Sequence, residues 1–327
     1  MCDRWIWITW ERHRRTRELC NDLGVRLFER DVEITRLIRY PYLLLWTAYT
    51  IARIRPGGVI VQNPSIVLAV WATILKYLFR YALIVDAHNQ GLRPIYQPLG
   101  RLQFLFRFVQ AKADLTVVTN DFLVEGVKLN GGNPFVLPDK LPVFADVPSM
   151  KLKGRYSVLC ISTFAKDEPV EDVIEAAAGL DSSDYRVYMT GNHRRLPRDV
   201  ASRIPPNVIL TGYLPEADYV ASLKGADVIL DLTHTDDCLV CGAYEAVAAG
   251  TPLIVTDTAA LRSYFCKGTI YTKNTPSDIR QAIVIALGQA TRLREEMIVL
   301  RNDLDERWQA QRDDLRRLMD ALAGRGH

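Results

Sequence analysis

Short apolar strands alternate with helical segments twice along this chain, and this alternation limits the possible folds more than any other feature. In the first half we expect strands at residues 5–10, 25–29, 59–62, 82–86, 115–119 and 135–137. In the second half we expect them at residues 157–161, 186–190, 208–211, 228–232, 253–256 and 269–271. Strands that are separated by helices form parallel sheets with helices on both faces. The sequence therefore predicts two doubly wound α/β halves.

The length of 327 residues fits two domains of roughly 150 residues each. A polar segment at residues 147–156 reads as a linker between them. We therefore expect one domain at residues 1–148 and a second at 149–300, followed by a C-terminal helix at 301–327. In open parallel sheets, ligands bind at the carboxyl ends of the strands.

Charge is unevenly spread along the chain. Residues 1–150 hold 19 Lys and Arg against 13 Asp and Glu, a balance of +6, whereas residues 151–327 hold 22 against 25, a balance of −3. A basic first half suggests an anionic partner such as a phosphorylated acceptor or a membrane surface, and a solvated basic face is the alternative. No basic run is long enough to favour nucleic acid. The apolar stretches 42–52 and 66–85 predict buried helices with a strand, or a surface that dips into a membrane interface.

The N-terminus and the cysteines both favour a cytoplasmic protein. Residues 1–10 lack the basic segment and long apolar core of a secretory signal. Cys238 and Cys241 have the spacing of a metal-ligand pair, but no second pair lies nearby in the sequence. We therefore expect neither a metal nor a redox role for the cysteines.

Two acids precede an apolar strand in the most distinctive stretch of the second half. Asp237 is followed after seven residues by Glu245, and a helix of small residues ends at Gly250 just before Pro252. This pattern resembles the nucleotide-sugar site of GT-B glycosyltransferases, above all the family-4-like ones known as glycosyl transferases group 1. The resemblance implies an α/β fold of two Rossmann-like domains with a cleft between them. It also implies a C-terminal helix that crosses back to the first domain, with Trp308 as a packing anchor.

The resemblance assigns the donor site to the second domain. Glu245 would open the helix and bind a ribose diol, and the helix N–H groups, at Cys241 and Gly242, would hold the diphosphate. Asp237 would act catalytically at the mouth of the cleft. The other expected donor contacts are Lys166, Gly191, Tyr213 and Leu214. The alternatives are that both acids only cap a helix and that Lys166 is a solvated turn residue.

The first domain would bind the acceptor. His88, two residues after Asp86 at the end of a buried strand, is expected to contact a sugar hydroxyl or to transfer a proton. Arg14, Arg15 and Asn89 are the expected acceptor contacts, and the arginines would bind a diphosphate bidentately. A capped strand end and a charged exposed helix face are the alternatives. Two segments of the first half, Gln62-Asn63-Pro64 and Asp86-x-His88-Asn89, also resemble the mannosyltransferase that extends the chitobiosyl lipid diphosphate of the dolichol pathway. Ser162-Thr163-Phe164 followed by Asp167-Glu168 in the second half resembles the same enzyme.

The resulting prediction is a hexosyltransferase. It would move a sugar from a UDP- or GDP-linked donor to a lipid-linked or cell-surface glycan acceptor, with peripheral contact at the cytoplasmic face of the membrane. The resemblance implies no cofactor and no required metal, since the nucleotide sugar is a substrate. Two alternatives are open: a nucleotide-sugar epimerase of similar fold, and a non-catalytic subunit that binds sugar nucleotides or glycans. The second is open because Asp237 stands where the family usually has Glu, and Leu239-Val240-Cys241 stands where it usually has Phe-Gly-Leu.

Overall fold

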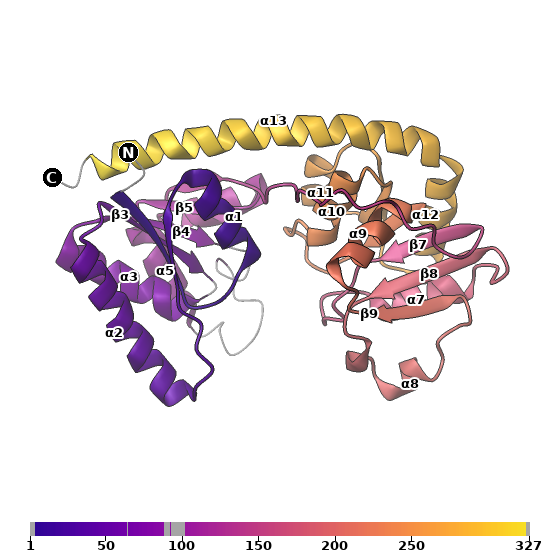
Figure 1. The fold of residues 1–327 in the computed structure, drawn as a ribbon, viewed down its shortest axis with the longest axis horizontal. Helices are drawn as coiled ribbons and strands as arrows, with labels where there is room; N and C mark the ends of the chain where they lie inside the picture. Colours follow the sequence, from indigo (N-terminus) through magenta and orange to yellow (C-terminus); the bar gives the residue numbers. More distant parts are fainter. Residues whose placement is uncertain (1–3, 64, 88–91, 93–101, 325–327) are drawn as a thin grey trace. The chain divides into compact units, whose positions relative to one another are not determined.

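The computed structural model describes residues 4–63, 65–87, 92 and 102–324. They form two compact units, the first made of residues 1–140 with 307–327 and the second of residues 141–306 (Figure 1). His88 and Asn89 lie outside the described residues. Among the described helices, none combines the length and the apolar character needed to cross a bilayer.

The first unit is built on a parallel six-stranded sheet in the order β2-β1-β3-β4-β5-β6. Its central strands β1, β3 and β4 are buried at every position and mostly apolar, with their polar residues near the carboxyl ends, which is typical of a sheet covered by helices on each side. The strands are β1 (Trp5–Thr9), β2 (Arg26–Glu29), β3 (Gly58–Asn63), β4 (Ala82–Ala87), β5 (Leu115–Val118) and β6 (Pro134–Val136).

Helices cover both faces of this sheet. One face packs against α2 (Arg36–Ile54), α3 (Ile66–Phe79), α5 (Gln103–Lys112) and α6 (Val124–Leu129), which follows the short turn η3 (Asp121–Leu123). The other packs against α1 (Arg14–Leu23) and the end of α13 (Ala290–Ala323). Trp308 of α13 is buried there and donates its Nε1–H to the Pro138 carbonyl at 3.2 Å.

The second unit has a parallel six-stranded sheet in the order β12-β11-β10-β7-β8-β9. The strands are β7 (Tyr156–Cys160), β8 (Tyr185–Thr190), β9 (Val208–Gly212), β10 (Val228–Asp231), β11 (Leu253–Thr256) and β12 (Thr269–Thr272). All twelve strands that the sequence predicts are therefore present in the two sheets.

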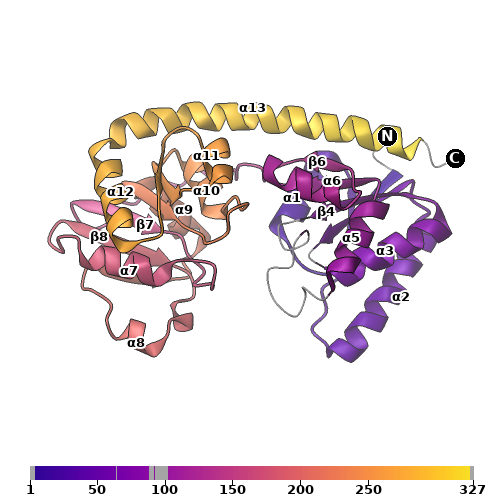
Figure 2. The same cartoon turned by 180° about the vertical axis from the view of Figure 1, so that it is seen from behind.

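The helices of this second sheet also lie on two faces. One face carries α9 (Glu216–Gly225), α10 (Cys241–Ala249), α11 (Ala259–Tyr264) and the start of α13. The other carries α7 (Val170–Ala178), α8 (Arg198–Ala201) and α12 (Pro276–Gly288), and the turn η4 (His193–Arg195) precedes α8 (Figure 2). α10 ends as predicted at Gly250, whose φ of 71° is a left-handed conformation that glycine adopts at no steric cost.

Candidate functional site

The second sheet changes direction of winding between β7 and β10, which lie side by side although β8 and β9 separate them in sequence. Ligands of doubly wound sheets bind outside the carboxyl ends of the strands at such a switch point. The loops that leave these two strands are residues 161–169 and 232–240. The first carries the predicted donor contact Lys166, and the second carries Asp237, which is half-buried.

The start of α10 is held by a buried acid, Asp231, at the end of β10. Asp231 accepts hydrogen bonds from the amides of Gly242 and Ala243. A Cβ on Gly242 would lie 2.5 Å from the Asp231 Oδ2 atom, so only glycine allows this approach. Burial, followed by the charges of Glu168 and Glu245, raises the pKa of Asp231 well above its usual value. The Gly242 amide, which is expected to hold the diphosphate, therefore already donates to the Asp231 carboxylate.

Glu245 lies one turn inside α10, since the helix begins at Cys241 and not at Glu245 as expected. It is half-buried, and its Oε2 atom accepts a hydrogen bond of 2.5 Å from the hydroxyl of Tyr219 in α9. Burial and the Glu245 carboxylate raise the pKa of Tyr219, which keeps the phenol a donor. Tyr219 did not emerge from the sequence, because no spacing rule connects residues 26 positions apart.

The loop after β7 wraps around the carboxylate of Glu168. That carboxylate accepts hydrogen bonds from the amides of Thr163 at 3.0 Å and Phe164 at 2.9 Å, and from the hydroxyls of Ser162 at 2.5 Å and Thr163 at 2.6 Å. Phe164 has a φ of 56°, an uncommon left-handed conformation for a bulky residue. Consecutive amides that converge on one anion form an anion-binding concavity. In this structure the anion is the chain's own Glu168.

A cavity of about 570 Å³ opens beside this loop. It is lined by the loop after β7, the first turn of α7, the segment before α8 and His234. Lys166 lies on it and is exposed, and Arg195, which the sequence did not single out, lies on it too. The Arg195 guanidinium donates to the Thr163 carbonyl at 3.3 Å. Two cationic side chains therefore stand at the switch point, next to the acids Glu171 and Asp172 of α7.

The ends of β8 and β9 hold the remaining predicted donor contacts. Gly191, with a φ of 93°, follows β8, and a Cβ there would lie 1.9 Å from the Ser162 carbonyl oxygen. This glycine is therefore required by the close approach of the β7 and β8 loops. Tyr213 and the half-buried Leu214 follow β9 at the edge of the sheet, and the Tyr213 side chain is 76% exposed. Cys241 is also exposed.

In the first unit, Arg15 is buried and ion-paired, whereas the sequence predicts it as a contact to the acceptor. Its side chain is 5% exposed and pairs with Asp86 at 3.1 Å and Asp139 at 2.6 Å, and it also donates to the Leu137 carbonyl at 2.8 Å. Burial opposes the Arg15 charge, but the two aspartates outweigh it and raise the pKa of Arg15. The guanidinium therefore links the ends of β4 and β6, and its charge is balanced by acids of the first unit itself. Arg14 is exposed and pairs with Glu18 at 2.7 Å.

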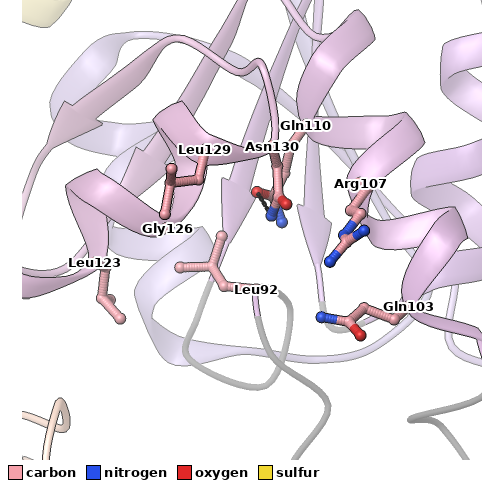
Figure 3. Close-up of a pocket in the computed structure, with 8 residues that line it drawn as sticks. All are labelled: Leu92, Gln103, Arg107, Gln110, Leu123, Gly126, Leu129 and Asn130. Atoms are coloured by element: carbon pink, nitrogen blue, oxygen red, sulfur yellow. Dashed lines mark hydrogen bonds between the residues drawn. The ribbon is translucent and has the colours of Figure 1, made fainter.

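A second cavity, of about 390 Å³, lies in the first unit between α5 and α6 and contains none of the predicted site residues. Asn130 donates to the Gln110 Oε1 atom at 2.9 Å on its wall (Figure 3). Within the described ranges, no group of three or more His, Cys, Asp or Glu side chains is arranged to hold a metal ion.

In the second unit, the structure groups Gly242, Glu245 and Glu168 around Asp231 and places Lys166 on the neighbouring cavity. The roles of these residues in donor binding stay predictions.

Known proteins resemble this chain in both sequence family and fold. Residues 155–290 match the family model described as Glycosyl transferases group 1. Among solved structures, sucrose-phosphate synthase from Thermosynechococcus elongatus is similar, with a TM-score of 0.76 at 15% identity over 97% of this chain and 98% of that one. HepE from Anabaena, in complex with UDP and glucose, gives a TM-score of 0.71 at 10% identity over 97% and 99%. A search of curated protein sequences finds no significant match.

A putative UDP-N-acetylglucosamine 2-epimerase from Listeria monocytogenes is also similar, with a TM-score of 0.59 at 14% identity over 90% of each chain. Likenesses at these identities show the fold. They confirm the predicted GT-B fold. The family match confirms a glycosyl transferases group 1 domain, which lies in the second unit. The resemblance to the dolichol-pathway mannosyltransferase stays a prediction.

Proposed function

We propose that the protein transfers a sugar from a nucleoside-diphosphate sugar to a lipid-linked or cell-surface glycan acceptor at the cytoplasmic face of a membrane. The observation that carries the proposal is the arrangement at the β7/β10 switch point, where the Glu245 carboxylate, the start of α10 and a cavity with two cationic side chains belong to one group 1 domain. Similar folds are recorded with UDP and with UDP-glucose. UDP-linked donors are therefore the first to test.

Each part of the donor has a candidate partner in the second unit. Glu245, held by Tyr219, would accept hydrogen bonds from the ribose hydroxyls. Lys166 and Arg195 would balance the diphosphate charge, so we expect turnover to survive chelation of divalent metals. The exposed ring of Tyr213 would stack on the base. His88 and Asp237 remain the proposed catalytic residues, and Arg14 and Asn89 the proposed acceptor contacts.

A screen of UDP- and GDP-linked sugars tests this proposal. Release of the nucleoside diphosphate that depends on an added glycan or lipid-diphosphate acceptor supports the transferase. Conversion of the nucleotide sugar without release supports an epimerase, a candidate that the Listeria likeness favours. Tight donor binding with neither outcome supports a binding subunit, a candidate favoured by the anion-binding loop that Glu168 already occupies.

The substitution Glu245→Ala is expected to weaken donor binding by about 1–3 kcal/mol, because it removes charge-assisted hydrogen bonds to the ribose. Isothermal titration calorimetry with the donor measures the change. Tyr219→Phe is the matched control, since it removes the hydroxyl that supports Glu245 but keeps the carboxylate. We expect Tyr219→Phe to cost less than Glu245→Ala. An unchanged donor affinity in Glu245→Ala would remove Glu245 from the site.

A further inference from the structure

Two neighbouring helices of the first unit, α2 and α3, expose large apolar side chains on their outer faces. In α2 these include Leu37, Ile38, Leu45 and Tyr49, and in α3 they include Ile74, Tyr77 and Leu78. The Leu37, Leu45 and Leu78 side chains are 88%, 73% and 71% exposed. The two helices lie side by side (Figures 1 and 2). The Trp71 Nε1–H of α3 donates to the Leu44 carbonyl of α2 at 3.0 Å. Monomeric proteins rarely leave such a contiguous apolar surface without a partner.

The exposed residues follow the same spacing in both helices. Ile38, Leu45 and Tyr49 stand at positions i, i+7 and i+11 of α2, and Val67, Ile74 and Leu78 repeat these offsets in α3. Such offsets place side chains along one side of a helix. The opposite side of each helix supplies the core of the unit, through residues such as Leu43 and Leu68. Each helix therefore has a buried apolar side and a second apolar side that faces away from the sheet.

The charged residues of the two helices and of the strand between them are all basic. From Ile34 to Val85 the chain contains no Asp or Glu, but it contains six basic residues, at positions 36, 39, 53, 55, 76 and 80. Lys76 pairs with Asp114 at 2.8 Å, and Arg39 donates to the Trp10 carbonyl at 3.2 Å. Arg36, Arg53, Arg55 and Arg80 are exposed at or near the ends of the two helices. The apolar surface is thus bordered by arginines.

We infer that this α2/α3 surface docks onto an anionic lipid bilayer. Leucine and isoleucine side chains would enter the acyl boundary, tyrosines would sit at headgroup level and the four arginines would contact lipid phosphates. A symmetric pairing of two copies through the same surface would instead bring these arginines toward one another, which opposes association. The inference deepens the proposed function, because it rests on a lipid-linked acceptor and names the surface that would bring the enzyme to it.

Vesicle flotation of the full chain tests the inference. We expect the protein to float with vesicles of two parts phosphatidylcholine to one part phosphatidylglycerol at low salt, and much less with phosphatidylcholine alone. The variant Leu45→Ser/Ile74→Ser/Leu78→Ser should lower the partition coefficient at least about tenfold, since three apolar side chains lose their insertion. The variant Arg36→Gln/Arg53→Gln/Arg80→Gln should lower it and weaken its dependence on salt.

The matched control is Val284→Ser/Ile298→Ser/Val299→Ser, which removes exposed apolar side chains from the second unit and should float like the natural protein. Thermal unfolding checks that each variant folds, followed by tryptophan fluorescence for the first unit and by far-ultraviolet circular dichroism for the control variant in the second unit. The inference is overturned if the natural protein does not float, if the Leu45/Ile74/Leu78 variant floats equally well, or if that variant instead dissolves a dimer seen by ultracentrifugation. Flotation without turnover of any donor would refute the proposed function and leave the docking surface standing.

Discussion

Arg15→Met should destabilise the first unit by about 3–5 kcal/mol, because it leaves the carboxylate of Asp86 buried without its counter-charge. Asp86 is 2% exposed, and the Arg15 guanidinium approaches both of its oxygens as well as Asp139 and the Leu137 carbonyl. All six tryptophans, at positions 5, 7, 10, 46, 71 and 308, lie in the first unit. Urea unfolding followed by tryptophan fluorescence therefore reports on this unit alone.

The neighbouring arginine provides the control for Arg15→Met. Arg14→Met removes the same charge from the same helix, but Arg14 is exposed and its pair with Glu18 is of the i,i+4 type, so we expect a change within about 0.5 kcal/mol. The double variant Arg15→Met/Asp86→Leu should recover much of the lost stability, since it removes the uncompensated charge. A loss below about 1 kcal/mol in Arg15→Met would contradict this prediction, because it would show that Asp86 does not depend on Arg15 for its counter-charge.

The strand pattern could be predicted from the sequence because each strand carries its own local signal. β4 and β10, for example, each begin with an apolar run that is followed by an acid, Asp86 or Asp231, and apolar runs are typical of buried parallel strands. The end of α10 also has a local signal, since Gly250 permits the left-handed turn that closes the helix. The start of α10 has a weaker one, because the helix begins one turn before Glu245, the acid expected to open it.

The contacts within the site depend on tertiary structure and leave no local signal. Arg15 meets Asp86 and Asp139 across 71 and 124 positions of sequence, so its row of arginine neighbours suggested an exposed anion-binding face instead. Asp231 falls within the strand predicted at residues 228–232, and no local pattern marks it as the acceptor for amides at the start of α10. The spacing of strands along the sequence predicts which loops meet at the sheet edge. It does not predict which side chain of the protein itself fills the anion-binding concavity of a loop.

Glu168 is the clearest example of such an occupant, and Glu168→Ala should destabilise the second unit by about 2–4 kcal/mol, because several charge-assisted hydrogen bonds in the loop lose their acceptor. Phe164 is buried, so its amide cannot turn to water without moving the loop. Urea unfolding followed by far-ultraviolet circular dichroism detects the change, while the tryptophan transition of the first unit should stay in place as an internal control.

The same variant decides what the loop does in catalysis. If Glu168 occupies the place of a donor phosphate, Glu168→Ala should bind UDP more tightly once folded, because the freed amides of Thr163 and Phe164 become available to an anion. If Glu168 instead shapes the loop so that Lys166 and Arg195 face the diphosphate, UDP binding should weaken in Glu168→Ala and recover in Glu168→Gln, which keeps one acceptor for the loop. Calorimetric titration of UDP into both variants separates these outcomes, and Glu171→Ala, an exposed acid on the same cavity, is the matched control for the loss of charge.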